Sequence, residues 1–213
     1  GIIGQMEHDN NLVVYETPRS AIAESFRGLR SSLHFMYNQE SQHGSKTIMV
    51  TSSVSGEGKT FTSINLATIF ALSGKRTLLM GLDLRKPKIF GDFNIKNDVG
   101  VVNYLIGQEA LETIIQKTEV DYLDIITSGP VPPNPSELLL SEKLNELISV
   151  LKTKYDYIIL DTPPVGLVAD ALELLDYVDA SLYVVRQDYT KRDMLNFVNE
   201  KYKTKQIKNI SLI

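Results

Sequence analysis

The 213-residue sequence contains no cysteine, and it has no long uninterrupted hydrophobic run. The absence of cysteine excludes disulfide bonds, thiol catalysis and cysteine-ligated metal centres, and it fits a reducing compartment. No apolar run approaches the roughly 20 residues that a helix needs to span a bilayer, and no secretory signal is visible. We therefore expect a soluble chain. Because it ends on the strand-like residues Ile210 to Ile213, we also expect it to be a fragment of a longer protein.

The sequence also lacks a large excess of charge of either sign. The 22 Lys and Arg residues and the 26 Asp and Glu residues leave a formal net charge of −4. This small acidic excess argues against a nucleic-acid partner, since proteins that bind nucleic acids usually carry basic surfaces. Hydrophobic residues make up 43% and charged residues 23%, which is typical of a globular protein and argues against a disordered or fibrous one. The length suits one domain with a full hydrophobic core.

The N-terminal residues 1–45 are expected to form an extension that carries one amphipathic helix. Thr17 suits its N-cap and Pro18 its first helical position. Apolar residues then recur at spacings of three and four, which places them on one stripe: Ile22, Phe26, Leu29, Leu33 and Met36. Glu24, Arg27 and Arg30 fall on the opposite half of the helix.

Residues 46–213 alternate strand-like runs with helical patterns. The predicted strands are Lys46–Ser52, Arg76–Leu82, Tyr122–Thr127, Tyr155–Leu160, Ala180–Val185 and Asn209–Ile213. The predicted helices are Thr60–Leu72, Val99–Ile106, Leu111–Gln116, Ser136–Lys152, Ala169–Leu175 and Thr190–Tyr202. Nearly continuous apolar strands separated by helices indicate a parallel sheet that is covered on both faces. We therefore predict a doubly wound α/β domain.

The strongest motif follows the first predicted strand. Ser53-Val54-Ser55-Gly56-Glu57-Gly58-Lys59-Thr60 is a Walker A loop with serine in place of its usual first glycine. Its glycines let backbone N–H groups turn toward phosphate oxygens, and the following helix N-terminus adds partial positive charge. Lys59 is expected to reach the β- and γ-phosphates, and the Thr60 hydroxyl to bind Mg²⁺. The predicted nucleotide-binding residues are Ser53, Val54, Ser55, Gly56, Glu57, Gly58, Lys59, Thr60 and Phe61. A chance strand-to-helix turn is the alternative.

Two aspartates stand at the ends of other predicted strands. Asp161 ends the fourth strand in the segment Leu160-Asp161-Thr162-Pro163-Pro164, as a Walker B carboxylate does. Asp83 follows the second strand. Because ligands of open α/β sheets bind beyond the carboxyl ends of the strands, both aspartates are candidates to face the metal. The alternatives are a capping aspartate before a proline turn and a solvated loop aspartate.

Together these elements resemble the bacterial tyrosine kinases, or BY-kinases, which control capsule and exopolysaccharide export. The motifs are the Walker A loop, the run from Asp83 through Arg85-Lys86-Pro87, and Asp161-Thr162-Pro163-Pro164. The segment Pro133-Asn134-Pro135-Ser136-Glu137-Leu138-Leu139 also matches, so the resemblance extends from about Thr17 to the end of the chain.

The resemblance implies a P-loop fold of the type shared with septum-placement and chromosome-partition ATPases (MinD and ParA). It implies ATP and Mg²⁺ as cofactors and autophosphorylation on tyrosine. Catalytic roles fall to Lys59, Asp83 and Asp161, and the metal ligands to Thr60, Asp83 and Asp161. Glu24, Arg27 and Arg30 match the family's oligomerisation motif, although a solvated face with Glu–Arg pairing within the helix is the alternative.

Two positions separate this sequence from related patterns. Partition ATPases carry an extra lysine near the start of the loop, where Val54 stands here, and this favours a kinase. In the family, the motif at the end of the second strand, called Walker A′, usually reads Asp-x-Asp. Gly81 occupies the place of its first aspartate, which is taken to help activate the attacking tyrosine hydroxyl, and Asp83 occupies the place of the second. Either Asp83 or Asp161 takes over this task, or the protein is a non-catalytic, ATP-binding regulator that assembles on a polysaccharide exporter. A partition-type ATPase is the third hypothesis.

The resemblance also implies partners and a location. It predicts a ring-like homo-oligomer, a membrane-embedded co-polymerase partner or N-terminal half, a phosphotyrosine phosphatase, and a place at the cytoplasmic face of the bacterial inner membrane. The acceptor tyrosines and the membrane anchor would lie outside this fragment, so none of the ten tyrosines is nominated as acceptor.

The remaining candidates are weaker. Arg186 follows the fifth strand where a nucleotide base is expected, although a plain surface loop fits equally well. Arg85 and Lys86 suit a phosphate contact, a partner contact or a solvated basic turn. The three histidines, His8, His34 and His43, show no metal-ligand spacing.

Overall fold

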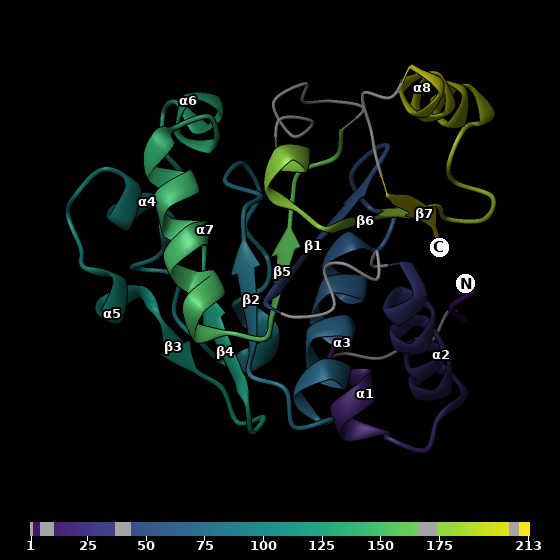
Figure 1. The fold of residues 1–213 in the computed structure, drawn as a ribbon, viewed down its shortest axis with the longest axis horizontal. Coiled ribbons are helices and arrows are strands. Elements are labelled where there is room, and N and C mark those ends of the chain that lie inside the picture. Colours follow the sequence, from purple (N-terminus) through teal and green to yellow (C-terminus); the bar gives the residue numbers. More distant parts are fainter. Residues whose placement is uncertain (1, 5–10, 37–43, 166–173, 205–208) are drawn as a thin grey trace.

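The structure, a computed structural model, describes residues 2–4, 11–36, 44–165, 174–204 and 209–213 (Figure 1). Its centre is a seven-stranded sheet in the order β3-β4-β2-β5-β1-β6-β7. The strands are β1 (Lys46–Ser52), β2 (Thr77–Gly81), β3 (Gln116–Lys117), β4 (Leu123–Ile126), β5 (Tyr157–Asp161), β6 (Ala180–Val184) and β7 (Ile210–Leu212). All neighbours pair in parallel except β3, a short edge strand that runs antiparallel to β4.

Helices cover both faces of this sheet (Figure 1). They are α1 (Val13–Glu16), α2 (Ala21–Met36), α3 (Lys59–Ala71), α4 (Val101–Leu105), α5 (Leu111–Ile114), α6 (Pro135–Leu139), α7 (Glu142–Lys154) and α8 (Arg192–Lys203), with a 3₁₀ turn, η2 (Gly91–Phe93). One core cluster joins α1, α2 and α3 to the sheet, and a second joins α4 to α7 to the opposite face. The predicted doubly wound, mostly parallel α/β fold is confirmed.

The strands explain the two cores. In β1, Ile48 and Val50 belong to the core beneath α3, whereas Met49 belongs to the core beneath α7. Successive strand residues point to opposite faces of a sheet, so both sets must be apolar when both faces are covered. All residues of β1 are buried as a result, and this burial is why the sequence lacks an alternating pattern there.

The start of the first long helix differs from the prediction. Thr17 is not an N-cap but the C-cap of α1, where its N–H and its hydroxyl both donate to the Val13 carbonyl. α2 begins at Ala21, and the Ser20 hydroxyl accepts the N–H of Ala23 at 3.2 Å in the manner of a cap. The sequence pattern did not predict α1, because that four-residue helix depends on contacts with α3.

Asn65 of α3 makes those contacts. It is fully buried, and its side-chain oxygen accepts the Val14 N–H at 2.8 Å. Its amide nitrogen donates to the carbonyls of Asn11 at 2.7 Å and Phe61 at 2.8 Å. The Asn65 side chain therefore links the segment before α2 to α3, the helix that follows the phosphate loop. Because α1 and α2 share a core with the sheet, the division of the chain at residue 45 remains a prediction.

Two other expected elements differ. The helix predicted over Ser136–Lys152 is divided into α6 and α7, because Ser141 is extended and begins a new helix as its N-cap. The helix predicted over Ala169–Leu175 falls mainly on residues outside those described, and the described residues 174–177 form a 3₁₀ turn.

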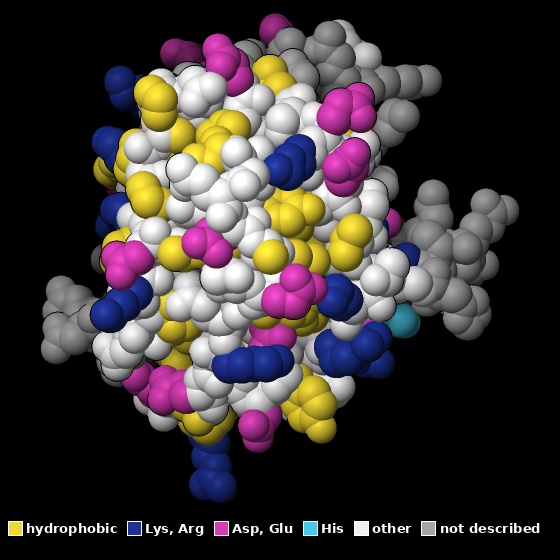
Figure 2. All heavy atoms as spheres, turned by 90° about the vertical axis from the view of Figure 1, so that its left-hand side faces the viewer, with side chains coloured by type: hydrophobic (Ala, Val, Ile, Leu, Met, Phe, Trp, Pro, Cys, Tyr) yellow, Lys and Arg dark blue, Asp and Glu magenta, His cyan; other side chains and the backbone are white. Residues whose placement is uncertain are grey.

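The surface on the side of α4 and α5 mixes hydrophobic, basic and acidic side chains (Figure 2). Neither sign of charge dominates this face, in keeping with the small net charge. In the described ranges, no helix combines the length and the apolar character needed to cross a bilayer.

Candidate functional site

The phosphate loop joins β1 to α3 at the centre of the sheet. β1 ends at Ser52, and α3 begins at Lys59. Gly56 has a φ of 90° and Gly58 a φ of 97°, which are left-handed conformations that residues with a Cβ rarely adopt. The two glycines therefore let the chain curl before the helix N-terminus, as an anion-binding loop requires.

Lys59 lies inside this loop. Its side chain is buried, and Nζ donates to the Ser52 hydroxyl at 3.3 Å. Burial lowers the pKa of Lys59, whereas the carboxylates of Asp161, Asp83 and Glu57 act to raise it. The neighbouring acids thus favour a charged ammonium group in a site that is poor in water.

Asp161 stands at the end of β5, opposite the first turn of α3. Its Oδ2 accepts the Thr60 hydroxyl at 3.0 Å, and its Oδ1 accepts the Ser63 hydroxyl at 3.1 Å. Burial raises the pKa of Asp161 to about 6, even though the Thr60 hydrogen bond and the charge of Lys59 act to lower it. The predicted metal ligands Thr60 and Asp161 are therefore in direct contact.

Asp83 lies beside Asp161 at the same edge of the sheet. The N–H groups of Leu82 and Asp83 both donate to the backbone carbonyl of Asp161, at 2.8 Å and 3.1 Å. The Asp83 carboxylate is half-buried, and Oδ1 accepts the Lys86 N–H at 3.1 Å. The three residues predicted to be catalytic, Lys59, Asp83 and Asp161, are thus brought together.

The other predicted loop residues have different surroundings. The Ser53 hydroxyl pairs with the Tyr183 hydroxyl at 2.7 Å, below the loop. The Val54 N–H donates to the carboxylate of Glu57 at 2.8 Å. The Phe61 ring packs against Phe26 of α2, with the ring centroids 5.9 Å apart, so its side chain is turned toward the core beneath α3.

Arg186, which was predicted to lie where a nucleotide base binds, contacts the phosphate loop from the segment after β6. Its guanidinium donates to the Gly56 carbonyl at 2.9 Å. The sequence did not single out Tyr189 or Thr190, which contact Ser55 and Glu57 from the same segment. Both carry a hydroxyl and stand just before α8, but a spacing of about 130 residues from the loop hid the contact.

Gly81, in the place of a Walker A′ aspartate, is tightly enclosed. A Cβ at this position would lie 2.8 Å from Ile89 Cδ1 and 3.1 Å from the Ser128 hydroxyl. The Ser128 hydroxyl is buried and has no hydrogen-bond partner within the described ranges. Ile89 therefore fills the space that a carboxylate at residue 81 would need.

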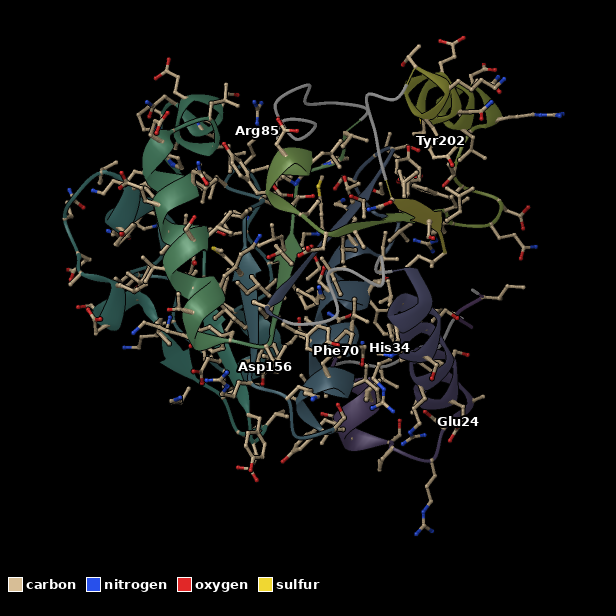
Figure 3. All side chains as sticks on the ribbon, in the orientation of Figure 1. Glu24, His34, Phe70, Arg85, Asp156 and Tyr202 are labelled. Atoms are coloured by element: carbon tan, nitrogen blue, oxygen red, sulfur yellow. The ribbon has the colours of Figure 1, made fainter. Side chains whose placement is uncertain are left out.

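The predicted oligomerisation residues lie on α2, away from the loop. Glu24 projects from the outer side of the helix and pairs with Arg27, which also donates to the Pro18 carbonyl (Figure 3). Arg30 is half-buried instead of exposed, and it donates to the Ile69 carbonyl at the end of α3 at 3.2 Å. Of the three residues predicted on the outer half of this helix, Glu24 is exposed, whereas Arg27 and Arg30 are both half-buried.

The remaining candidates are Arg85 and the three histidines. The Arg85 guanidinium donates to the Ser136 hydroxyl at 2.8 Å, near the start of α6. In Figure 3 it lies at the edge of the molecule opposite Asp156, which precedes β5. His34 is exposed on α2, and His8 and His43 lie outside the described residues.

The residues of this site fit a magnesium ion. No group of three or more His, Cys, Asp or Glu side chains is placed to hold a metal among the residues that were described. Mg²⁺ differs from metals that need such a cage, since it keeps several waters and binds through one or two carboxylates plus substrate phosphates. The Thr60 hydroxyl and the Asp161 carboxylate beside the phosphate loop supply this kind of donor set.

Comparisons with known proteins point the same way. The family described as an AAA domain matches residues 45–208. The tyrosine-protein kinase YwqD of Bacillus subtilis is 38% identical over 86% of this chain and 76% of its own length. A putative tyrosine-protein kinase in the cps region of Klebsiella pneumoniae is 40% identical over 82% of this chain but only 24% of its own length.

Solved structures agree with these relatives. The kinase domain of the Escherichia coli tyrosine kinase ETK superposes with a TM-score of 0.87 at 31% identity, over 98% of this chain and 81% of that one. The cell division ATPase MinD of Pyrococcus furiosus superposes with a TM-score of 0.64 at 25% identity, over 78% of this chain and 69% of that one. The predicted fold type is confirmed.

Proposed function

Because the chain belongs to the family of bacterial tyrosine-protein kinases, we propose that it is an ATP-dependent tyrosine autokinase that controls the synthesis and export of a capsular or extracellular polysaccharide. The observation that carries this proposal is the contact between Thr60 and Asp161, at 3.0 Å, beside the buried Lys59. It joins the phosphate loop to the carboxylate of a second strand, as phosphoryl transfer requires.

The chain's own residues would divide the work. The loop N–H groups and the Lys59 ammonium would hold the β- and γ-phosphates and stabilise charge on the transferred group. Thr60 and Asp161 would hold Mg²⁺, with Asp83 acting directly or through water. The ion, when bound, neutralises negative charge on the phosphate oxygens.

The transfer itself needs a proton acceptor. A tyrosine oxygen forms a bond to the γ-phosphorus, the bond from that phosphorus to the β–γ bridging oxygen breaks, and ADP leaves. The tyrosine proton, with an ordinary pKa of about 10, passes to a carboxylate. Asp161 is buried, and both its oxygens already accept hydroxyls. Asp83 is half-buried, and only its Oδ1 has a hydrogen-bond donor in the described part of the chain, so Asp83 suits the role of base better.

Assembly and location are further parts of this proposal. The ion pair of the exposed Glu24 with the half-buried Arg27, together with Arg30, would contact a neighbouring copy in a ring-like homo-oligomer. The acceptor tyrosines would come from a neighbouring subunit. A membrane-embedded co-polymerase partner or N-terminal half would hold the ring at the cytoplasmic face of the inner membrane. A phosphotyrosine phosphatase would reverse the modification.

The test uses the full-length protein incubated with ATP and Mg²⁺, with phosphotyrosine detected by mass spectrometry. We expect phosphotyrosine in the parent and none in Lys59→Met, because the ammonium that stabilises the transferred group is lost. Arg192→Met, an exposed cation on α8, is the matched control and should label normally. A parent that binds ATP but forms no phosphotyrosine would refute the kinase.

A second candidate is a non-catalytic regulator that binds ATP and assembles on a polysaccharide exporter. The enclosed Gly81 favours it, because no carboxylate can stand there without moving Ile89. The double variant Gly81→Asp/Ile89→Ala makes room for the carboxylate. Phosphotyrosine in this variant but not in the parent would favour the regulator, whereas labelling in both would favour the kinase with Asp83 as base.

A further inference from the structure

Residues 186–190, here called the strap, follow β6 and contact the phosphate loop. We propose that Tyr189 and Thr190 of the strap are positioning residues that hold the loop in its nucleotide-binding conformation. This inference rests on the nucleotide binding in the proposed function, but it does not require phosphoryl transfer. Neither residue would touch the nucleotide, since both act through the backbone and the Glu57 side chain.

The strap makes a hydrogen bond to each of three successive loop residues. The Tyr189 hydroxyl donates to the Ser55 carbonyl at 3.1 Å, and the Arg186 guanidinium donates to the Gly56 carbonyl at 2.9 Å. The Thr190 hydroxyl donates to Oε1 of Glu57. A segment that is distant in sequence therefore restrains the whole middle of the loop.

The two carbonyl contacts determine where the N–H groups point. A peptide group is planar and trans, so its C=O and the N–H of the next residue point in opposite directions. When the strap draws the carbonyls of Ser55 and Gly56 toward itself, the N–H groups of Gly56 and Glu57 turn to the other side. No acceptor within the described residues takes either N–H. These are the donors that a phosphate-binding loop offers its ligand.

The Glu57 carboxylate restrains the start of the loop in the same way. Although charged, it is buried, and its Oε2 accepts the Val54 N–H at 2.8 Å. Thr190 supplies the hydroxyl on the other oxygen and itself accepts the Arg186 N–H at 2.9 Å. Without that hydroxyl, Oε1 of the buried carboxylate would lose its donor, which costs free energy and weakens the restraint of Glu57 on the Val54 N–H.

The Tyr189 ring adds a steric restraint. Its hydroxyl lies 3.0 Å from the point where a Cβ on Gly56 would stand, so the strap packs directly on the glycine. The Arg186 guanidinium lies 5.2 Å from the centre of the ring, within the range of a cation–π contact. Tyr189→Phe keeps the ring and this contact and removes only the hydroxyl.

The experiment measures MgADP binding to the full-length protein by isothermal titration calorimetry. We expect Thr190→Val and Tyr189→Phe each to raise the Kd at least about fivefold, since Tyr189→Phe removes one hydrogen bond and Thr190→Val removes two. Thr190→Ser keeps the hydroxyl and should stay within about twofold of the parent, by the same reasoning. Two exposed positions are the matched controls and should bind like the parent: Thr113→Val on α5 and Tyr202→Phe on α8, the latter labelled in Figure 3.

Thermal unfolding of the nucleotide-free variants separates positioning from a general structural role. A role in stability alone would lower the midpoint temperature of Thr190→Val while leaving the Kd for MgADP unchanged, and this result would overturn the inference. Unchanged Kd values for both strap variants would also overturn it. A parent that binds MgADP but forms no phosphotyrosine refutes only the proposed function, whereas a parent that binds no MgADP refutes both.

Discussion

Asp161 is the residue at which stability and function conflict. Burial raises the pKa of its carboxyl from 3.8 to about 6, so the folded chain without metal binds this proton more tightly than the unfolded chain does. Through this shift, Asp161 contributes to the free energy of unfolding fully below pH 4, and the contribution is lost as the pH rises through about 6. At neutral pH the fold keeps a carboxylate that weakens it, as expected of a group retained for metal binding.

Asp161→Asn should therefore stabilise the metal-free protein at pH 7.5, by on the order of 1–3 kcal/mol for a pKa shift of this size. The amide still accepts one hydroxyl from α3 and carries no charge. The gain should vanish near pH 4, where the parent carboxyl is protonated too. Urea unfolding at both pH values measures it, and a variant less stable than the parent at pH 7.5 would contradict the prediction.

Asp156→Asn is the matched control, and its effect on the free energy of unfolding should have the opposite sign. A hydrogen bond from Arg76 lowers the pKa of Asp156, so its contribution is present above the unfolded pKa and lost as the pH falls. The control should thus be slightly less stable than the parent at pH 7.5.

The residues of the site could be predicted where the motif consists of residues that are adjacent in the sequence. The order of glycine, lysine and threonine between a strand and a helix identified the loop and the first turn of α3. The enclosure of Gly81 by Ile89 and Ser128 was not predictable, because it depends on how three separate segments pack. The partly buried Arg30 was missed for the same reason, since a helical wheel does not show that α3 ends beside it.

Among the elements, the strands were the easiest to predict. β1 has the predicted bounds, and β4, β6 and β7 lie within one residue of theirs. Fully buried parallel strands are continuous apolar runs, which few other structures produce in so short a stretch. α1 and β3 were missed because four and two residues carry too little pattern of their own, so tertiary contacts determine them.

Asn65→Ala tests such a tertiary contact. The change leaves the Val14 N–H and the Asn11 carbonyl without this partner, so we expect the free energy of unfolding to fall by about 2–4 kcal/mol. Urea unfolding followed by circular dichroism measures this loss. Asn196→Ala, an exposed position on α8, should change stability by less than about 0.5 kcal/mol. A loss at Asn65 as small as that would show that α1 is held by apolar packing alone.

At the scale of the whole molecule, the proposed assembly depends on α2. Glu24→Ala/Arg27→Ala should reduce the full-length protein to smaller species in light scattering after size exclusion. Among the described residues, this ion pair has one further partner, the Pro18 carbonyl, and a pair within one helix contributes about 0.2–0.5 kcal/mol, so the fold should survive.

Lys154→Ala/Arg192→Ala removes two exposed cations on α7 and α8 and should leave the assembly unchanged. An α2 variant that keeps the parent's mass in solution would exclude these residues from the interface.

The strap also affects the order in which the chain matures. The phosphate loop is made early, but the side chains that restrain it lie about 130 residues later in the chain. At a synthesis rate of about 5–20 residues per second, the loop waits roughly 7–26 s for these partners. Until β6 has joined β1, the protein has its phosphate-binding sequence but not the conformation that the strap imposes. Competence to bind nucleotide should thus arise late, with the closing of the sheet.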